Sequence, residues 1–319
     1  MQKLHLGAAQ CALDLGDGSE RAEYVNQDYI LHKLGRPHRA IGIMYTYYPH
    51  DKQWPQRISK ACKDMNITFQ WDYPYDDYFP FNADGQPWEQ MRDIRRHGQD
   101  AALTLTLDCS LSDDELREVA RMLRPYGRMT IRINHECGGT WFTHNKRFTY
   151  EQVGKFFAHF SDIIHQEAPN VRTVFCAGFA QADGKLEKED EFAVAYRAAD
   201  VWSADCYLAL HYGWPYDVAE VGGGQYKADS VGMYYDMFRR TYERASSQFG
   251  AKPLVTAEFN TDGDVTGPRH QGESVIRFAE AFRDHKADWF KAISLYQFRD
   301  RGRLGLEIED PNNPAVGMD

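Results

Sequence analysis

Three consecutive stretches of sequence decide the fold class: MTIRIN at residues 129–134, TYEQVGKFFAHFSDII at 149–164 and VRTVFCA at 171–177. The first and third are short apolar runs rich in β-branched residues, which predict buried strands. The middle stretch opens with a capping box from Thr149 to Gln152 and places its apolar residues on one stripe, which predicts a helix. A helix between two buried strands is the repeating unit of a parallel sheet.

The same alternation of strand and helix continues along the whole chain. A second capping box, from Ser112 to Glu115, opens another helical stretch, and no linker-like break interrupts the 319 residues. This length favours one closed (β/α)8 TIM barrel, with residues 1–319 as a single domain. No Rossmann glycine fingerprint follows the first strand, which disfavours an open doubly wound sheet. The candidate strands are Leu4–Ala8, Ala40–Tyr45, Ile67–Trp71, Ala101–Leu107, Met129–Asn134, Val171–Ala177, Val201–Tyr207, Leu254–Phe259 and Ala292–Tyr296.

Nine candidate strands are one more than such a barrel holds. We expect Ala101–Leu107 to be an extended excursion between the third and fourth barrel strands. The alternative is that this run is a true barrel strand.

The charge and composition exclude several classes of partner. The chain carries 37 Lys+Arg against 47 Asp+Glu, a formal net charge of −10, and it has no block of basic residues. Nucleic acids and anionic membrane surfaces are bound through clustered positive charge, so neither is an expected partner. No run approaches the roughly 18 apolar residues of a membrane span. Aromatic residues make up 14% of the chain, which favours a ring-filled core and a groove that stacks flat ligands.

The cysteines and the N-terminus give weaker indications. No CxxC pair and no His at zinc-finger spacing is present, so no metal or other cofactor is predicted. The cysteines are expected to be small buried hydrophobes, with one disulfide or a reactive thiol as the alternative. The first residues are too few and too polar for a signal-peptide core, so the chain is expected to be either cytoplasmic or a secreted or periplasmic protein numbered without its leader. The six cysteines are Cys11, Cys62, Cys109, Cys137, Cys176 and Cys206.

Polar residues gather where the predicted strands end. In a barrel of this kind the reacting residues stand at the carboxyl ends of the strands. Two of these residues are glutamates, Glu136 and Glu258, and a buried unpaired carboxylate costs enough free energy that each needs a partner or a function. The polar strand ends are Asn134-His135-Glu136, Asp205-Cys206-Tyr207, Glu258-Phe259-Asn260 and Tyr296-Gln297.

Two carboxyl groups on facing strand ends are what cleavage of a glycosidic bond requires. One carboxylic acid protonates the departing oxygen, and one carboxylate stands on the opposite side of the sugar ring. When the carboxylate attacks carbon directly, the two groups lie ~5–5.5 Å apart and the anomeric configuration is retained. The alternative for either glutamate alone is a salt bridge to a neighbouring arginine.

The same strand ends resemble a known family. RINHECGGTW at 132–141 resembles the fourth-strand motif of glycoside hydrolase family 26, the β-mannanase family of clan A. KPLVTAEF at 252–259 resembles the seventh-strand segment that presents the nucleophile, and ADVWSADCY at 199–207 is similar to the sixth strand with its Asp-x-Tyr ending. With the weaker match ITFQW at 67–71, the resemblance spans most of the chain. It implies a metal-independent, retaining hydrolase of mannan-like or related β-linked polysaccharides and oligosaccharides.

The resemblance also implies a role for each residue of these motifs. Glu136 would be the general acid/base and Glu258 the nucleophile. His135 would bind the sugar beside the scissile bond, and Tyr207 would hydrogen-bond Glu258. Arg132 would supply the positive charge that keeps the nucleophile ionised. From the residues alone, His135 can equally be a satisfied core imidazole and Arg132 part of an ion pair inside the barrel.

Two positions depart from the family pattern. Gly138 stands where the family usually has Asn, and Tyr296 begins a Tyr-Gln-Phe segment where clan members commonly place a Trp. An indole or phenol face can stack on the C–H patch of a pyranose ring. The aromatic residues expected to stack on sugar are Trp141, Trp71, Trp214 and Tyr212.

Two other functions fit parts of the pattern. In a metal-dependent sugar isomerase or epimerase, Glu136, Asp205, Glu258 and a His would bind a divalent cation. A cation beside Arg132 would be repelled, which disfavours that alternative. The other is a carbohydrate-binding barrel that has lost its activity, and the presence of both glutamates speaks against it.

Overall fold

The computed structural model describes residues 12–14, 25–50, 85–139, 147–208, 231–261, 268–296 and 298. Strands and helices alternate along these residues. The strands are β1 (Ala12–Asp14), β2 (Ala40–Tyr47), β3 (Asp100–Leu107), β4 (Met129–Ile133), β5 (Val171–Phe175), β6 (Val201–Ser203), β7 (Cys206–Tyr207), β8 (Leu254–Asn260) and β9 (Phe290–Tyr296). The helices are α1 (Gln27–Leu34), α3 (Gln86–Arg96), α4 (Asp113–Leu123), the short 3-10 helix η1 (Arg124–Tyr126), α5 (Tyr150–Glu167), α6 (Ala193–Ala198), α7 (Val231–Phe249) and α9 (Pro268–Asp284).

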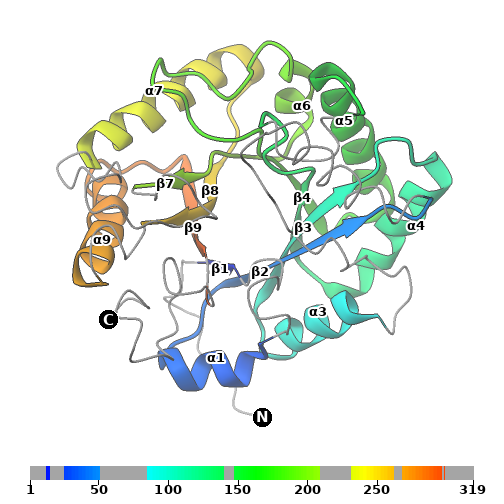
Figure 1. Ribbon diagram of the computed structural model, residues 1–319, viewed down its shortest axis with the longest axis horizontal. Helices are drawn as coiled ribbons and strands as arrows, with labels where there is room; N and C mark the ends of the chain where they lie inside the picture. The colour runs from blue at the N-terminus through cyan, green and yellow to red at the C-terminus, as the bar shows by residue number, and fades with distance from the viewer. Residues whose placement is uncertain are drawn as a thin grey trace, which may run out of the picture.

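The strands form one closed parallel ring. Their order is β6-β5-β4-β3-β2-β1-β9-β8-β7, and a further pairing of β6 with β8 closes the circle. The short strands β6 and β7 are two parts of one run, broken at Ala204 and Asp205, so the ring has eight positions. Helices surround the ring on the outside (Figure 1). The fold is therefore the predicted (β/α)8 barrel.

The expectation for Ala101–Leu107 is wrong, because this run is a barrel strand. As β3 it pairs with β2 from Ala40↔Asp100 to Tyr47↔Leu107 and with β4 on its other side. Both of its faces are covered, because its residues from Leu103 to Leu107 are all buried. With β3 in place, β4 is the fourth strand of the ring and β8 the seventh.

Two predicted strands lie outside the described residues, namely Leu4–Ala8 and Ile67–Trp71. The first position of the ring is filled by β1, which pairs with β2 and β9. Since β2 pairs with β1 on one side and β3 on the other, the ring has no place for a further strand between β2 and β3.

Both predicted capping boxes are present and begin their helices at the expected residues. Ser112 and Glu115 cap α4, and Thr149 and Gln152 cap α5. Each box satisfies backbone amides that the first turn of a helix leaves unpaired. The apolar faces of these helices are buried against the strands.

Aromatic rings fill much of the layer between the strands and the helices. Phe282 of α9 stacks on Phe290 of β9 with ring centroids 4.0 Å apart, and Phe278 stacks on Phe259 of β8 at 4.3 Å. Cys109, Cys137, Cys176 and Cys206 are unbridged, and the last three are buried. Cys11 and Cys62 lie outside the described residues. None of the described helices combines the length and the apolarity needed to cross a bilayer.

Candidate active site

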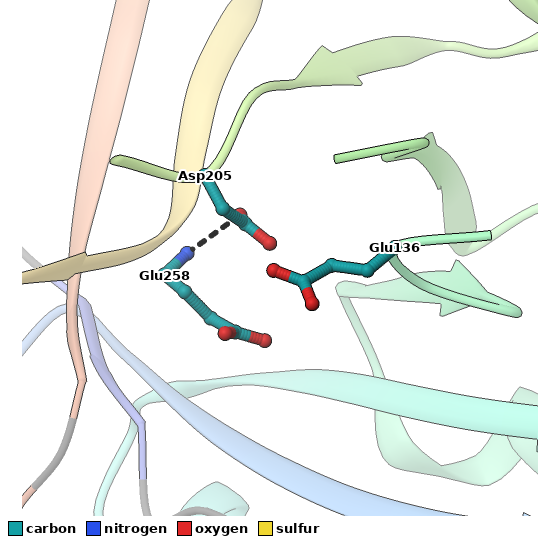
Figure 2. Close-up of side chains that lie close together, drawn as sticks. All are labelled: Glu136, Asp205 and Glu258. Atoms are coloured by element: carbon teal, nitrogen blue, oxygen red, sulfur yellow. Dashed lines mark hydrogen bonds between the residues drawn. The ribbon is translucent and has the colours of Figure 1, made fainter. Parts of the chain in front are cut away.

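Glu136 and Glu258 meet at the carboxyl ends of their strands. Glu136 follows β4, and Glu258 lies near the end of β8. Figure 2 shows their side chains pointing toward each other, with Asp205 beside them. One carboxylate oxygen from each of the three residues lies within 4.8 Å of the others. Carboxyl groups whose oxygens approach this closely fit the ~5–5.5 Å separation typical of retaining glycosidases better than the ~6.5–9.5 Å of inverting ones.

The turn after β4 holds Glu136 in an unusual backbone conformation. Asn134 and Glu136 have φ of 48° and 49°, in the left-handed region that few non-glycine residues adopt. The Asn134 side chain accepts a hydrogen bond from the backbone of Leu107 (2.7 Å), which ties the turn to β3. The backbone N–H of Glu136 donates to the carbonyl of Cys176 (2.8 Å), which ties it to the end of β5. Neighbouring strands thus fix the direction of the Glu136 side chain.

Gly138 is required by the packing of this turn. Its N–H donates to the carbonyl of Ala177 at 2.7 Å. A Cβ atom at position 138 would lie 2.6 Å from that carbonyl oxygen and 2.5 Å from Cγ of Glu187. The asparagine that family 26 usually has here would therefore clash with backbone, and Glu187 fills the space instead.

We expect Gly138→Ala to lower the free energy of unfolding by about 1–3 kcal/mol, because the added methyl group overpacks the turn. Any activity that depends on Glu136 should fall as well, since Glu136 is only two residues away. Urea denaturation and kcat/KM would measure both effects. Gly232→Ala in α7 is the matched control, because a Cβ there meets nothing within 4 Å. Equal stability of the two variants would contradict the prediction.

Glu258 is held by donors on both carboxylate oxygens. Arg132 donates from Nη2 to Oε1 at 2.6 Å, and the Tyr207 hydroxyl donates to Oε2 at 2.9 Å. The backbone N–H of Glu258 donates to Oδ1 of Asp205 at 3.0 Å. The pairing of β8 with β9 shifts register between Thr256 and Phe259, an irregularity typical of strands that aim a side chain into an active site.

Arg132 and Asp205 form a buried network behind the two glutamates. Arg132 is 4% exposed, and its Nε donates to the hydroxyl of Thr104 at 2.9 Å. Its Nη1 donates to Oδ2 of Asp205 at 3.2 Å, and the Cys176 thiol donates to the same oxygen at 3.3 Å. Burial, followed by the negative charge of Glu258, raises the pKa of Asp205 to about 7.

The environment of Glu136 favours the protonated form of its carboxyl group. Burial raises its pKa well above the usual range for glutamate, and the negative charges of Glu258 and Asp205 raise it further. A hydrogen bond to Asp205 also raises this pKa, as expected when the protonated Glu136 carboxyl is the donor. The site therefore contains one carboxyl group suited to donate a proton, that of Glu136. The second, that of Glu258, accepts hydrogen bonds from an arginine and a tyrosine.

The structure brings several predicted residues together and leaves others undescribed. Arg132 and Tyr207 contact Glu258 directly. His135 is 3% exposed, and its Nδ1 lies 3.5 Å from the Thr106 hydroxyl of β3. The predicted stacking residues Trp141, Trp71, Trp214 and Tyr212 lie outside the described residues.

Asp205 is a central residue to which the sequence gave a specific role only in the metal alternative, although it also stood among the polar strand ends. The feature of the sequence that pointed to Asp205 was the Asp-x-Tyr ending of the sixth strand. This ending puts a buried carboxylate two residues before Tyr207. Tyr296, at the position of the missing Trp, lies beside Tyr207 with ring centroids 6.2 Å apart. Phe179, which no pattern indicated, also lies near Tyr207, with ring centroids 6.4 Å apart.

The three carboxylates are close enough to bind a cation, but their partners do not suit one. Arg132 already occupies one oxygen of Asp205 and one of Glu258, so a divalent ion would sit against a guanidinium. The metal alternative also required a histidine ligand, and among the described residues this cluster contains carboxylates alone. The geometry therefore favours acid/base chemistry over a metal centre.

Comparison with known proteins gives the fold. The sequence matches no protein-family profile and no curated protein. A GH26 β-mannanase from Bacteroides ovatus has a TM-score of 0.57 at 10% identity, over 96% of this chain and 86% of that one. An arabinofuranosidase has a TM-score of 0.59 at 12% identity, over 94% of this chain and 66% of its own. A β-glycosidase from Pyrococcus horikoshii has a TM-score of 0.53 at 13% identity, over 98% of this chain and 91% of that one. At such low identity these similarities show the fold: the chain is a (β/α)8 barrel of the kind found in glycoside hydrolases.

Proposed function

We propose that this protein is a retaining glycoside hydrolase, with Glu258 as the nucleophile and Glu136 as the general acid/base. The observation that carries the proposal is the pair of carboxyl groups, with oxygens within 4.8 Å, at the ends of the fourth and seventh strands. Their environments differ in the way the reaction needs, because one is a proton donor and the other is held by Arg132 and Tyr207. The barrel fold shared with glycoside hydrolases supports it.

In the first step an oxygen of Glu258 attacks the anomeric carbon while Glu136 protonates the departing glycosidic oxygen. The product is a covalent glycosyl-enzyme with the leaving group released. In the second step Glu136 removes a proton from water, which attacks the same carbon and frees Glu258. Two inversions give a product with the configuration of the substrate.

The change of role at Glu136 follows from electrostatics. The charge of Glu258 is one cause of the raised pKa of Glu136. Formation of the covalent bond removes that charge, so the pKa of Glu136 falls and the group can then act as a base. Asp205 remains as the anchor of Arg132 through both steps.

The substrate that we propose is a β-linked glycan of the mannan type or a close relative. The motif resemblance to family 26 supports it, as does the GH26 β-mannanase among the proteins of similar fold. His135 would contact the sugar beside the scissile bond. Trp141, Trp71, Trp214 and Tyr212 would supply the stacking faces.

A panel of β-linked polysaccharides, with sizing of the products, tests the proposal. At least one glycan should be cleaved, and NMR should detect the β-anomer of the product before mutarotation. Chelation with EDTA should leave the rate unchanged. First release of the α-anomer, or loss of activity with EDTA, would contradict the mechanism. Calorimetric binding of an oligosaccharide without any product would indicate the inactive carbohydrate-binding barrel instead.

A further inference from the structure

The segment that follows β5 borders the turn of Glu136. Backbone hydrogen bonds join Glu136 to Cys176 and Gly138 to Ala177, so the two segments run together at the mouth of the barrel. The chain then reaches Gly178 and Phe179. The carbonyl of Gly178 accepts the N–H of Asp205 at 3.1 Å, and Phe179 forms a parallel bridge with Asp205.

The ring of Phe179 lies close to the catalytic groups. It is partly exposed, and its centroid is 6.4 Å from that of Tyr207, whose hydroxyl binds Glu258. A partly exposed phenyl ring at a barrel mouth is a flat apolar surface beside polar groups, which is the environment that a sugar ring requires.

Glu187 and Gln181 form a polar pair in the segment that carries this ring. The Gln181 amide donates one hydrogen bond to the carbonyl of Phe179 and one to Oε2 of Glu187. Glu187 lies over the backbone of Gly138 and Gly178, with Oε2 3.5 Å from the Cβ position of Gly178. Among the residues that the structure describes, Oε1 of Glu187 and Oε1 of Gln181 have no hydrogen-bond partner, although both side chains are about half-buried. Two acceptors are thus open in the segment that carries the phenyl ring.

We propose that Phe179, Gln181 and Glu187 form the site that binds the leaving group, and that this leaving group is itself a sugar. The inference rests on the proposed function. The departing oxygen must lie against its proton donor Glu136, and these three residues belong to the segment that packs on the turn of Glu136. The phenyl ring would take the C–H face of the sugar, and the two open oxygens would accept hydrogen bonds from its hydroxyl groups. The enzyme therefore cuts between sugars of a chain.

The test compares two substrates with different leaving groups. One is mannopentaose, whose leaving group is a sugar, and the other is β-mannobiosyl fluoride, whose leaving group is a single atom. Phe179→Ala and Glu187→Gln should each lower kcat/KM for the oligosaccharide by roughly 10-fold to 100-fold. Both should leave kcat for the fluoride unchanged. Glu191→Gln, the same change at an exposed position of the same segment, is the matched control for both substrates.

The fluoride also reports whether Glu136 has moved. Its turnover depends on hydrolysis of the covalent intermediate, in which Glu136 acts as the base, so a displaced Glu136 would lower this rate. Equal loss on both substrates would therefore assign Phe179 and Glu187 a structural role and overturn the proposal. Unchanged kcat/KM on the oligosaccharide would also overturn it. If the unmodified protein cleaves neither substrate nor any glycan of the panel, the proposed function itself has failed.

Discussion

Glu258→Ala is expected to abolish hydrolysis, with kcat lower by about 10⁴-fold or more, because the variant has no atom that can form the covalent intermediate. The fold should survive, since alanine leaves only a small cavity. Arg132 loses Glu258 as a partner but keeps its ion pair with Asp205. Initial rates on the best glycan of the panel, with urea denaturation of the same sample, would measure both.

Azide distinguishes loss of the nucleophile from general damage. The cavity in Glu258→Ala admits this small anion, which can attack the anomeric carbon while Glu136 protonates the leaving group. A single displacement gives a glycosyl azide of inverted configuration. Glu118→Ala, at an exposed glutamate of α4, should behave as the unmodified enzyme. Substantial activity of Glu258→Ala without azide would refute its role as nucleophile.

The architecture could be predicted from the sequence because it depends on local pattern. Capping boxes at Ser112 and Thr149 and buried runs between helical stretches lead to a barrel. What pattern could not decide was which of two apolar runs, Ile67–Trp71 or Ala101–Leu107, enters the ring after β2. Strand membership is set by pairing with distant neighbours, and β3 is identified by its hydrogen bonds to β2 and β4.

The meeting of Glu136 and Glu258 was also predictable. The carboxyl ends of all strands in a parallel barrel open at the same face, so polar residues at those ends converge even when they are far apart in sequence. Arg132 and Tyr207 were expected near Glu258 because the family resemblance implied it.

Contacts between loops and irregular strand ends were not predictable. The break between β6 and β7 places Asp205 where its backbone binds Gly178 and its side chain binds Arg132. The sequence showed a continuous run there. Similarly, the sequence showed only that Gly138 stands where family 26 usually has Asn, whereas the structure shows that Glu187 occupies the space beside it. Such pairs have no spacing rule, because they come from different loops brought together by the ring.

The second large effect is expected for Glu136→Ala. Without its proton donor, the enzyme should cleave glycans with a sugar leaving group about 10²–10⁴-fold more slowly. β-Mannobiosyl fluoride needs little help from an acid, so its first step should be much less affected, and the intermediate should accumulate because the base of the second step is missing. A burst of fluoride followed by slow turnover would be the signature.

The pH dependence of the hydrolysis rate tests whether the raised pKa belongs to Glu136. Glu136 acts as an acid only while protonated. The value of kcat/KM for a glycan should therefore be highest at pH values below the pKa of Glu136 and fall as the pH rises through that pKa. Because burial and the charges of Glu258 and Asp205 raise that pKa, this alkaline limb should lie well above the usual range of a glutamate. Glu136→Ala should lose the limb. An alkaline limb unchanged in the variant would show that another group supplies the proton.

Azide completes the assignment of Glu136, because its product differs from that of the nucleophile variant. In Glu136→Ala, Glu258 still forms the covalent intermediate, and azide enters the space of the missing carboxyl group to attack it. Two displacements then give a glycosyl azide of retained configuration, whereas Glu258→Ala gives the inverted one. Opposite anomers from the two variants would require the two carboxyl groups to act from opposite sides of the sugar. The same anomer from both would contradict the proposed division of roles between Glu136 and Glu258.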